Sequence, residues 1–144
     1  MEKQSLKAMN GNIIIRLMVG LVFLSEGIQK FLFPDADGVS RFIKIGIPHP
    51  EFFAPFTGST EIICGLLLIV GLVTRLASIP LLIIIVTAIC TTKVPMFLDK
   101  GFWAAAHEGR ADFCMLLGPI FLLLYGAGKY SLDSTFTSHE RNPT

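Results

Sequence analysis

Charged side chains interrupt long apolar stretches of this sequence, where an unpaired charge is costly. The segment FLSEGIQKFLFP carries Glu26 and Lys30 four residues apart at the end of an apolar run, in the Glu-before-Lys order that favours an ion pair on one helix face. Glu61 is the only charged residue between Phe52 and Thr74. A glutamate has little reach toward water from such a segment, so its position indicates a function.

These residue types suggest proton-transfer chemistry. Glu61 could accept a proton, while Lys30 or Arg110 could stabilise an oxyanion that develops on a ligand. We therefore take Glu61 and Lys30 as candidate catalytic residues. The candidate ligand-binding residues are further ionisable groups: Glu26, Arg16, Lys93, Arg110, Asp112 and His107. Most are expected at the same end of the molecule as Glu61 and Lys30. Arg16 lies about two turns deeper, and His107 lies in a connection between helices.

The same charges also have a purely structural interpretation. Long basic side chains near helix ends can extend to the membrane surface, and Lys30, Lys93 and Arg110 could all do so. An ion-pair network that only ties helices together explains every charge except Glu61 equally well.

The sequence predicts no metal site. Its three cysteines, Cys64, Cys90 and Cys114, lie in apolar stretches without a CxxC motif, and no two histidines have metal-ligand spacing. The cysteines could form a layer beneath the charges, although cysteine in an apolar helix usually acts as a small apolar residue. No dinucleotide or phosphate-binding glycine motif is present either.

Four apolar blocks must position these side chains. They are Ile13–Phe33, Phe52–Val73, Leu76–Leu98 and Phe113–Ala127. Three reach the ~20 residues that cross a bilayer, and the fourth does so only with Arg110–Asp112 included. With 52% hydrophobic residues and stretches that have no polar face, the chain is predicted to be an all-α membrane protein. Its expected architecture is an up-down bundle of four transmembrane helices.

The connections between the blocks are unequal in length. The first, Pro34–Glu51, holds the turn signals PDADG and GIPHP around GVSRFIKIG, which is predicted to form a short helix at the membrane surface. The second, Gly71–Arg75, is so short that it makes its two helices antiparallel neighbours. The third, Asp99–Gly109, contains Trp103, a residue suited to the membrane boundary.

The predicted bundle forms one domain over residues 1–133, and the polar tail 134–144 is predicted to be disordered. Four crossings place both termini at one end, called the near end, and the first and third connections at the far end. Lysines and arginines divide equally between the ends. Lys30, Lys93 and Arg110 lie within or beside the helices and can be set aside. The remaining basic residues are more numerous at the near end. Both termini are therefore predicted to be cytoplasmic. The net charge of +1 suggests no nucleic-acid partner.

Several of these residues also carry a family resemblance. Arg16 followed by Gly27-x-x-Lys30-Phe31 is similar to the first helix of DoxX proteins. The segment GIPHPEFFAPFTGSTEIICGLLLIVGLVTRLAS resembles the most recognisable stretch of that family, and GAGKYSLD resembles its closing GxGxYSLD. The matching positions of the long segment are Gly46, Pro48, Glu61, Gly65, Gly71, Thr74 and Arg75. Glu26 departs from the pattern, since many members have a small residue or histidine there.

The resemblance implies a compact four-helix bundle in a bacterial inner membrane. It also implies a link to quinone-dependent sulfur oxidation, as in the small subunits of thiosulfate:quinone oxidoreductase, or to membrane complexes that handle thiol stress. The expected partners are then the lipid bilayer, a quinone or lipid, and other oxidoreductase subunits or a second copy of the chain. Because members of this family are linked to several different processes, the resemblance does not determine which reaction this chain takes part in.

Three functional hypotheses follow. In the first, the chain is a membrane subunit of a quinone- or thiol-linked oxidoreductase system with a polar intramembrane site. In the second, it is a non-catalytic membrane adaptor or assembly chaperone whose charge cluster is structural. The third, a small-solute transporter, ranks last because the sequence shows neither a repeat nor a broken helix.

Overall fold

The computed structural model describes residues 2–128 and 130–133, with side chains from Gly11 onward, and these residues form helices without any strand. The elements are α1 (Glu2–Leu32), α2 (Val39–Lys44), α3 (Pro50–Val70), α4 (Thr74–Ala88), the π-helical turn η1 (Ile89–Lys93), α5 (Val94–Lys100), α6 (Phe102–Glu108) and α7 (Arg110–Tyr125). The all-α prediction is confirmed. The predicted tail, 134–144, lies outside the described residues.

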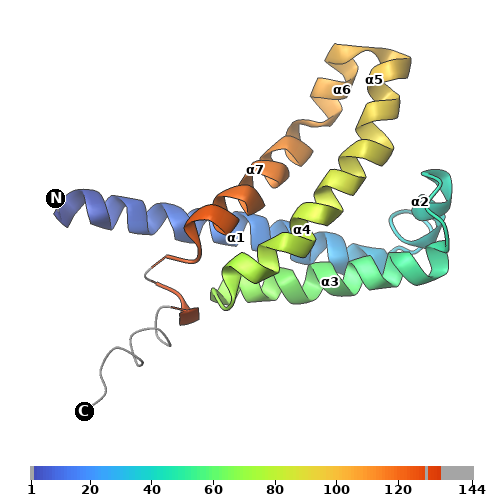
Figure 1. Cartoon of the computed structure of the whole chain (residues 1–144). Helices are drawn as coiled ribbons and strands as arrows, with labels where there is room; N and C mark the ends of the chain where they lie inside the picture. Colours follow the sequence, from blue (N-terminus) through green and yellow to red (C-terminus); the bar gives the residue numbers. More distant parts are fainter. Residues whose placement is uncertain (1, 129, 134–144) are drawn as a thin grey trace.

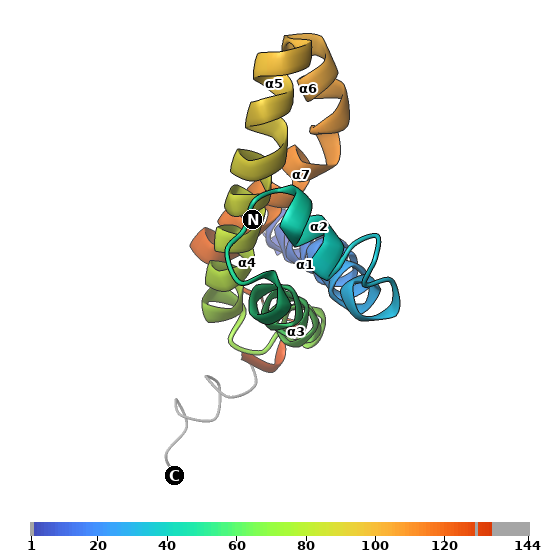
Figure 2. The same cartoon turned by 90° about the vertical axis from the view of Figure 1, so that its right-hand side faces the viewer.

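The helices form two antiparallel pairs. α1 and α3 lie side by side, and α7 returns along the continuous helix α4–η1–α5 (Figure 1). The pairs meet near the tight turn at Gly71 and diverge toward the far end, where α2 lies above the start of α3 and below α5 (Figures 1 and 2). The short second connection therefore makes α3 and α4 neighbours, as predicted.

Reciprocal glycine contacts bring α1 and α3 together. A Cβ atom added to Gly27 would lie 2.7 Å from the carbonyl oxygen of Gly58, and one added to Gly65 would lie 2.9 Å from that of Gly20. The two contacts are seven residues apart on each helix, so they repeat after two turns on the same face. Small residues at these positions allow the two backbones to touch.

Apolar side chains fill the space between the two pairs. Val19 and Phe23 of α1 are buried against Leu68 of α3, Leu81 of α4 and Leu122 of α7. Many other large apolar side chains point outward, as expected where helices face hydrocarbon rather than water. The chain thus has a small packed core inside an apolar exterior.

Three helical segments are long and apolar enough to cross a membrane: Gly11–Leu32, Pro50–Val70 and Thr74–Lys100. α7 has 16 residues and spans about 24 Å at 1.5 Å per residue, less than the ~30 Å of a typical hydrocarbon core. The structure therefore shows three candidate spans together with further, shorter helices.

The connections differ from expectation at one point. The predicted surface helix is present as α2, with Phe42 buried. The third connection, in which the sequence analysis predicts no helix, folds into α6, because the sequence FWAAAHE contains three alanines, the strongest helix formers. α5 and α6 together form a helical hairpin that projects from the bundle (Figure 1).

The third apolar block forms one long helix with a wider turn inside it. Pro95 has no N–H to donate to the carbonyl four residues earlier, and its ring crowds that carbonyl. The π-helical turn Ile89–Lys93 ends two residues before this proline and accommodates it. The wider turn places Thr91, Thr92 and Lys93 on the side that faces the rest of the bundle, as their partial burial shows.

Candidate functional site

A buried ion pair joins α1 to α3 toward the far end. The Nζ atom of Lys30 lies 2.7 Å from Oε2 of Glu61, and the two side chains are only 10% and 4% exposed. The contact brings together Glu61 and Lys30, the two candidate catalytic residues from the sequence. An acid and a base buried this deeply stabilise each other only while both are present.

The glycine contacts determine where this pair forms. Lys30 follows Gly27 by three residues, and Glu61 follows Gly58 by three residues. Gly27 and Gly58 touch each other, and Cβ of Glu61 and Cβ of Lys30 would lie 3.0 and 3.4 Å from Cβ atoms added at Gly27 and Gly58. Because helical side chains lean toward the N-terminal end of their own helix, both charged side chains extend back toward this contact and meet beside it. The backbone approach thus positions the ion pair.

A second carboxylate contacts the same lysine. Oε2 of Glu26 lies 3.9 Å from Nζ of Lys30, one turn earlier on α1. The Glu26 side chain is 47% exposed, whereas that of Glu61 is almost fully buried. Lys30 therefore lies between an inner and an outer carboxylate.

The pair faces a pocket of about 580 Å³ between the two helix pairs, beneath α2. Five charged residues line it: Glu26, Lys30, Arg41, Glu61 and Asp112. The other lining residues are mostly apolar and include Phe42, Phe53, Phe56, Ile83 and Met115. A largely apolar pocket with a few convergent polar groups, of this volume, is typical of small-molecule sites.

A second ion pair connects the other two helices at this end. Nζ of Lys93, in η1, lies 3.2 Å from Oδ2 of Asp112, in the first turn of α7. Asp112 lines the pocket, and Lys93 lies outside the lining. The two ion pairs thus tie α1 to α3 and η1 to α7 at similar levels of the bundle.

The structure does not bring the remaining candidates into the pocket. Arg110 is exposed, and its Nη1 donates a hydrogen bond of 2.8 Å to the carbonyl oxygen of His107, which is exposed as well. Neither residue lines the pocket.

Arg16 lies at the near end, away from the pocket. The residue is 5% exposed, and its guanidinium donates to three backbone carbonyls: those of Ala127 and Tyr130 at 3.0 Å each, and that of Ile69 at 3.2 Å. These bonds tie α1 to the end of α3 and to the segment after α7. The position of Arg16 is therefore that of a structural clamp.

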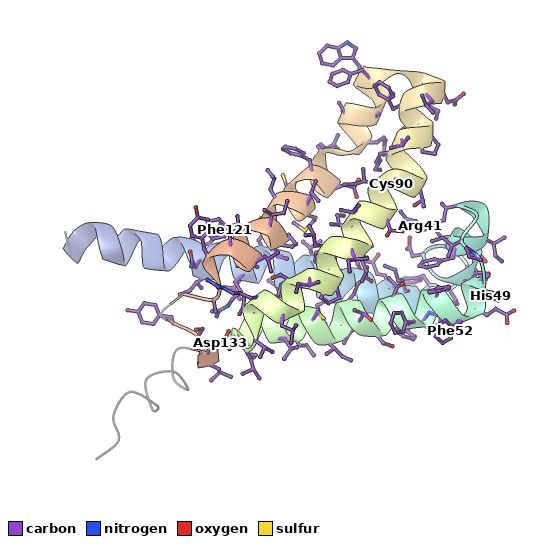
Figure 3. All side chains as sticks on the ribbon, in the orientation of Figure 1. Arg41, His49, Phe52, Cys90, Phe121 and Asp133 are labelled. Carbon is purple, nitrogen blue, oxygen red and sulfur yellow. The ribbon has the colours of Figure 1, made fainter. Side chains whose placement is uncertain are left out.

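The same segment also caps α4. Oδ1 and Oδ2 of Asp133 accept hydrogen bonds from the backbone N–H groups of Val73 and Thr74, at 2.6 and 3.0 Å. Figure 3 shows Asp133 beside this turn. Val73 has a positive φ of 44°, unusual for a β-branched residue, so the bonds from Asp133 hold a strained turn.

Sequence reasoning missed Arg41 as a pocket residue. Arg41 is on the side of α2 that faces α4 (Figure 3), and its Nη1 lies 3.3 Å from Oδ1 of Asp37. The charged face of the predicted surface helix was the available signal. Threonines at positions 57, 87, 91 and 92 also line the pocket, and the hydroxyl of Thr92 donates to Ala88 at 2.6 Å.

The cysteines do not form one layer. Cys64 is buried in the core, whereas Cys90 and Cys114 are exposed, so only one of the three lies under the charges inside the bundle. Within the described part of the chain, no three His, Cys, Asp or Glu side chains are grouped so that they could hold a metal ion.

Comparison with known proteins places this fold in a family. The DoxX family model matches residues 11–94. A Mycobacterium tuberculosis (strain ATCC 25618 / H37Rv) protein, "Uncharacterized membrane protein Rv3486", is 56% identical over 127 residues, which cover 84% of this chain and 78% of the relative. "Putative oxidoreductase CatD" of Bacillus subtilis (strain 168) is 29% identical over 133 residues, 92% of this chain and 91% of the relative. No solved structure matches the chain significantly. The chain is a multi-pass membrane protein and belongs to the DoxX family.

Proposed function

We propose that the chain is a small membrane subunit of an oxidoreductase system and that its pocket binds a membrane-soluble ligand of quinone size. The observation that carries this proposal is the Lys30–Glu61 ion pair, buried in a membrane helix pair yet facing a pocket of about 580 Å³. Intramembrane charges that line a cavity generally mark ligand or proton sites. The name of the Bacillus subtilis relative supports the reaction class.

The two charged groups divide the chemistry between them. The carboxylate of Glu61 accepts a proton from a ligand hydroxyl, and the ammonium of Lys30 donates a hydrogen bond to a ligand oxygen that carries negative charge. Glu26 provides a second acceptor 3.9 Å from Lys30 on the more exposed side. Asp112 is the other candidate residue that lines the pocket, and it forms an ion pair with Lys93.

In this proposal the chain crosses a bacterial inner membrane four times. α7 makes the fourth crossing, with the bilayer thinned around its 16 residues, because a short helix is accommodated at modest cost. Both termini lie in the cytoplasm. The partners are other membrane subunits of the redox system or a second copy of the chain.

The identity of the bound molecule tests the proposal. The full chain is purified in mild detergent, and the co-purifying small molecules are extracted and identified by mass spectrometry. We expect a quinone in stoichiometric amount with the wild type and a much smaller amount with Glu61→Gln. The matched control is Glu51→Gln, an exposed acid in the first turn of the same helix, which should retain the wild-type amount.

One arrangement favours a second candidate function. The two ion pairs join helices at similar levels, and the glycine contacts position one of them, as a structural scaffold requires. A non-catalytic adaptor or assembly chaperone would carry such a cluster without any ligand. Wild-type protein that is folded, free of quinone, and co-purifies with an unrelated membrane complex would favour this alternative.

A further inference from the structure

The walls of the pocket differ in polarity. Its charged groups lie on α1, α2, α3 and the first turn of α7. The wall from α4 consists of Ile83, Ile84, Ile85, Thr87 and Ala88, and the hydroxyl of Thr87 already donates to the carbonyl oxygen of Ile83 at 2.8 Å. The pocket therefore has a polar side and an apolar side.

The apolar side reaches the outer surface. Phe56 of α3 and Ile83 of α4 line the pocket, yet they are 58% and 62% exposed. Both lie in segments long and apolar enough to cross a membrane, so their exposed faces contact hydrocarbon. α3 and α4 diverge from their common turn toward the far end (Figure 1). Since exposed residues of both helices line the pocket, we take the pocket to open toward the lipid between Phe56 and Ile83.

The charges on the polar side are already paired, with one carboxylate in excess. Lys30 contacts Glu61 and Glu26, Arg41 contacts Asp37, and Lys93 contacts Asp112. These contacts join four carboxylates to three bases. An anionic ligand would meet the excess carboxylate, and it would have to displace a paired carboxylate to reach a base. Such a site therefore disfavours phosphate groups.

We infer that the occupant is an uncharged-headed amphiphile whose hydrocarbon chain leaves the pocket between Phe56 and Ile83 into the bilayer. The inference rests on the proposed function and specifies its ligand class. The polar head lies against Lys30 and Glu61, where it can both accept and donate a hydrogen bond. The chain passes along the α4 wall, and the excess carboxylate rejects anionic phospholipids.

Three probes with matched parts test this inference on the full chain in detergent. They are decylubiquinone, the same dimethoxy-methyl-benzoquinone ring without its chain, and decyl phosphate, which has the same chain and an anionic head. Binding is measured by equilibrium dialysis. We expect wild-type protein to bind decylubiquinone at least about tenfold more tightly than decyl phosphate, because the excess carboxylate repels the phosphate.

Two obstructing variants test the route of the chain. Ile83→Trp fills the opening, and Thr87→Trp, one turn further along α4, provides a second obstruction. Each should weaken decylubiquinone binding by about tenfold or more through steric overlap, with little effect on the chainless ring. The control is Ile79→Trp. Ile79 lies one turn before Ile83, is 43% exposed and is not part of the lining. This variant should change the binding of neither decylubiquinone nor the chainless ring.

The outcomes separate the inference from the proposed function. Unchanged decylubiquinone binding in both obstructing variants overturns the chain route, and decyl phosphate binding as tightly as decylubiquinone overturns the head selectivity. If Glu61→Gln binds the reduced, hydroxyl-bearing forms of both ring probes as tightly as the wild type while the tryptophan variants lose only decylubiquinone, the proposed role of Glu61 fails and the chain route stands. Wild-type protein that binds neither quinone contradicts both.

Discussion

Lys30 is the residue on which the site depends, because it contacts both carboxylates. Its ammonium lies 2.7 Å from Glu61 and 3.9 Å from Glu26, with the Lys30 side chain 10% exposed. Removing one partner of a buried pair leaves an uncompensated charge, whereas removing both leaves none. This difference distinguishes a true pair from two independent side chains.

Lys30→Met should therefore destabilise the protein more than the double variant Lys30→Met/Glu61→Gln. The single change leaves Glu61 buried without its base, at a cost of about 3–5 kcal/mol. The double change replaces both charges with neutral groups of similar size and recovers most of that loss. Thermal unfolding in detergent measures both, with the exposed Lys44→Met as the matched control. Equal unfolding temperatures for the single and double variants would show that the pair is not coupled.

The residues of this pair could be predicted from the sequence, and those at the near end could not. Glu61 and Lys30 stand out because charges are rare in apolar segments and their depths match. Arg16 donates to backbone carbonyls, and because every residue has a carbonyl, the sequence cannot identify these partners. Arg41 lines the pocket because of the orientation of α2. The irregular turns on either side of α2 set that orientation, and the sequence does not predict it.

At the scale of elements, the glycine contacts between α1 and α3 determine the geometry of the site. A Cβ at Gly27 would overlap the backbone of α3 at 2.7 Å, and backbone atoms have little room to shift. The helices would separate and the ion pair would lengthen. The same helix contains Gly11, where nothing lies within 4 Å of an added Cβ.

Gly27→Ala and Gly11→Ala should therefore have opposite effects on stability. We expect Gly27→Ala to destabilise the fold by about 1–3 kcal/mol through overpacking. Gly11→Ala should be neutral or stabilising by up to about 1 kcal/mol, because alanine favours a helix. The unfolding temperatures of the two variants check this. A Gly27→Ala variant as stable as the wild type would contradict the close helix contact.

The clamp at the near end joins three elements through one side chain. Arg16→Lys keeps the charge but loses the planar fork that reaches the carbonyls of Ala127, Tyr130 and Ile69. We expect a loss of about 1–3 kcal/mol, since buried carbonyls lose their donors. Limited proteolysis should then cut the segment after α7 sooner than in wild type. The control is Arg75→Lys. Arg75 is exposed, and within the described residues it donates one hydrogen bond, to the carbonyl oxygen of Leu124.

The elements themselves were predictable to different degrees. Long apolar runs and the short turn at Gly71 predict α1, α3 and the α4–α5 helix with their neighbours. α6 is not predicted, because its aromatic and charged residues obscure the three alanines. The π-helical turn follows from Pro95, yet a proline inside an apolar run predicts equally a kink or a wider turn.

At the scale of the whole molecule, the pocket lies at the end where the helix pairs diverge. The far end contains Lys30, Glu61 and the connection with α2, and the near end contains the clamp at Arg16. In the proposed function, the side of the membrane that the far end faces decides from which compartment protons reach Glu26. The excess of basic residues at the near end predicts that this end lies in the cytoplasm.

Reporter fusions test this orientation. A reporter of the cytoplasm fused after Thr144 should be active, and a reporter of the external side inserted near Ala36 should be active as well. Ala36 is exposed between α1 and α2, so the insertion disturbs no packed residue. The opposite pattern would reverse the orientation, and reporters on the same side of the membrane would exclude the three crossings expected between Ala36 and Thr144.

The most direct measurement of the central claim is the dissociation constant of decylubiquinol, the reduced form whose hydroxyl can donate to Glu61, for wild type, Glu61→Gln and Glu51→Gln in one detergent, together with the unfolding temperature of each. If the buried pair is a ligand site, Glu61→Gln stays folded and binds at least about tenfold more weakly, since a charge-assisted hydrogen bond contributes about 1.5–3 kcal/mol. Glu51→Gln binds as wild type does. A folded Glu61→Gln protein with unchanged affinity would contradict the account and leave the pair as a structural link.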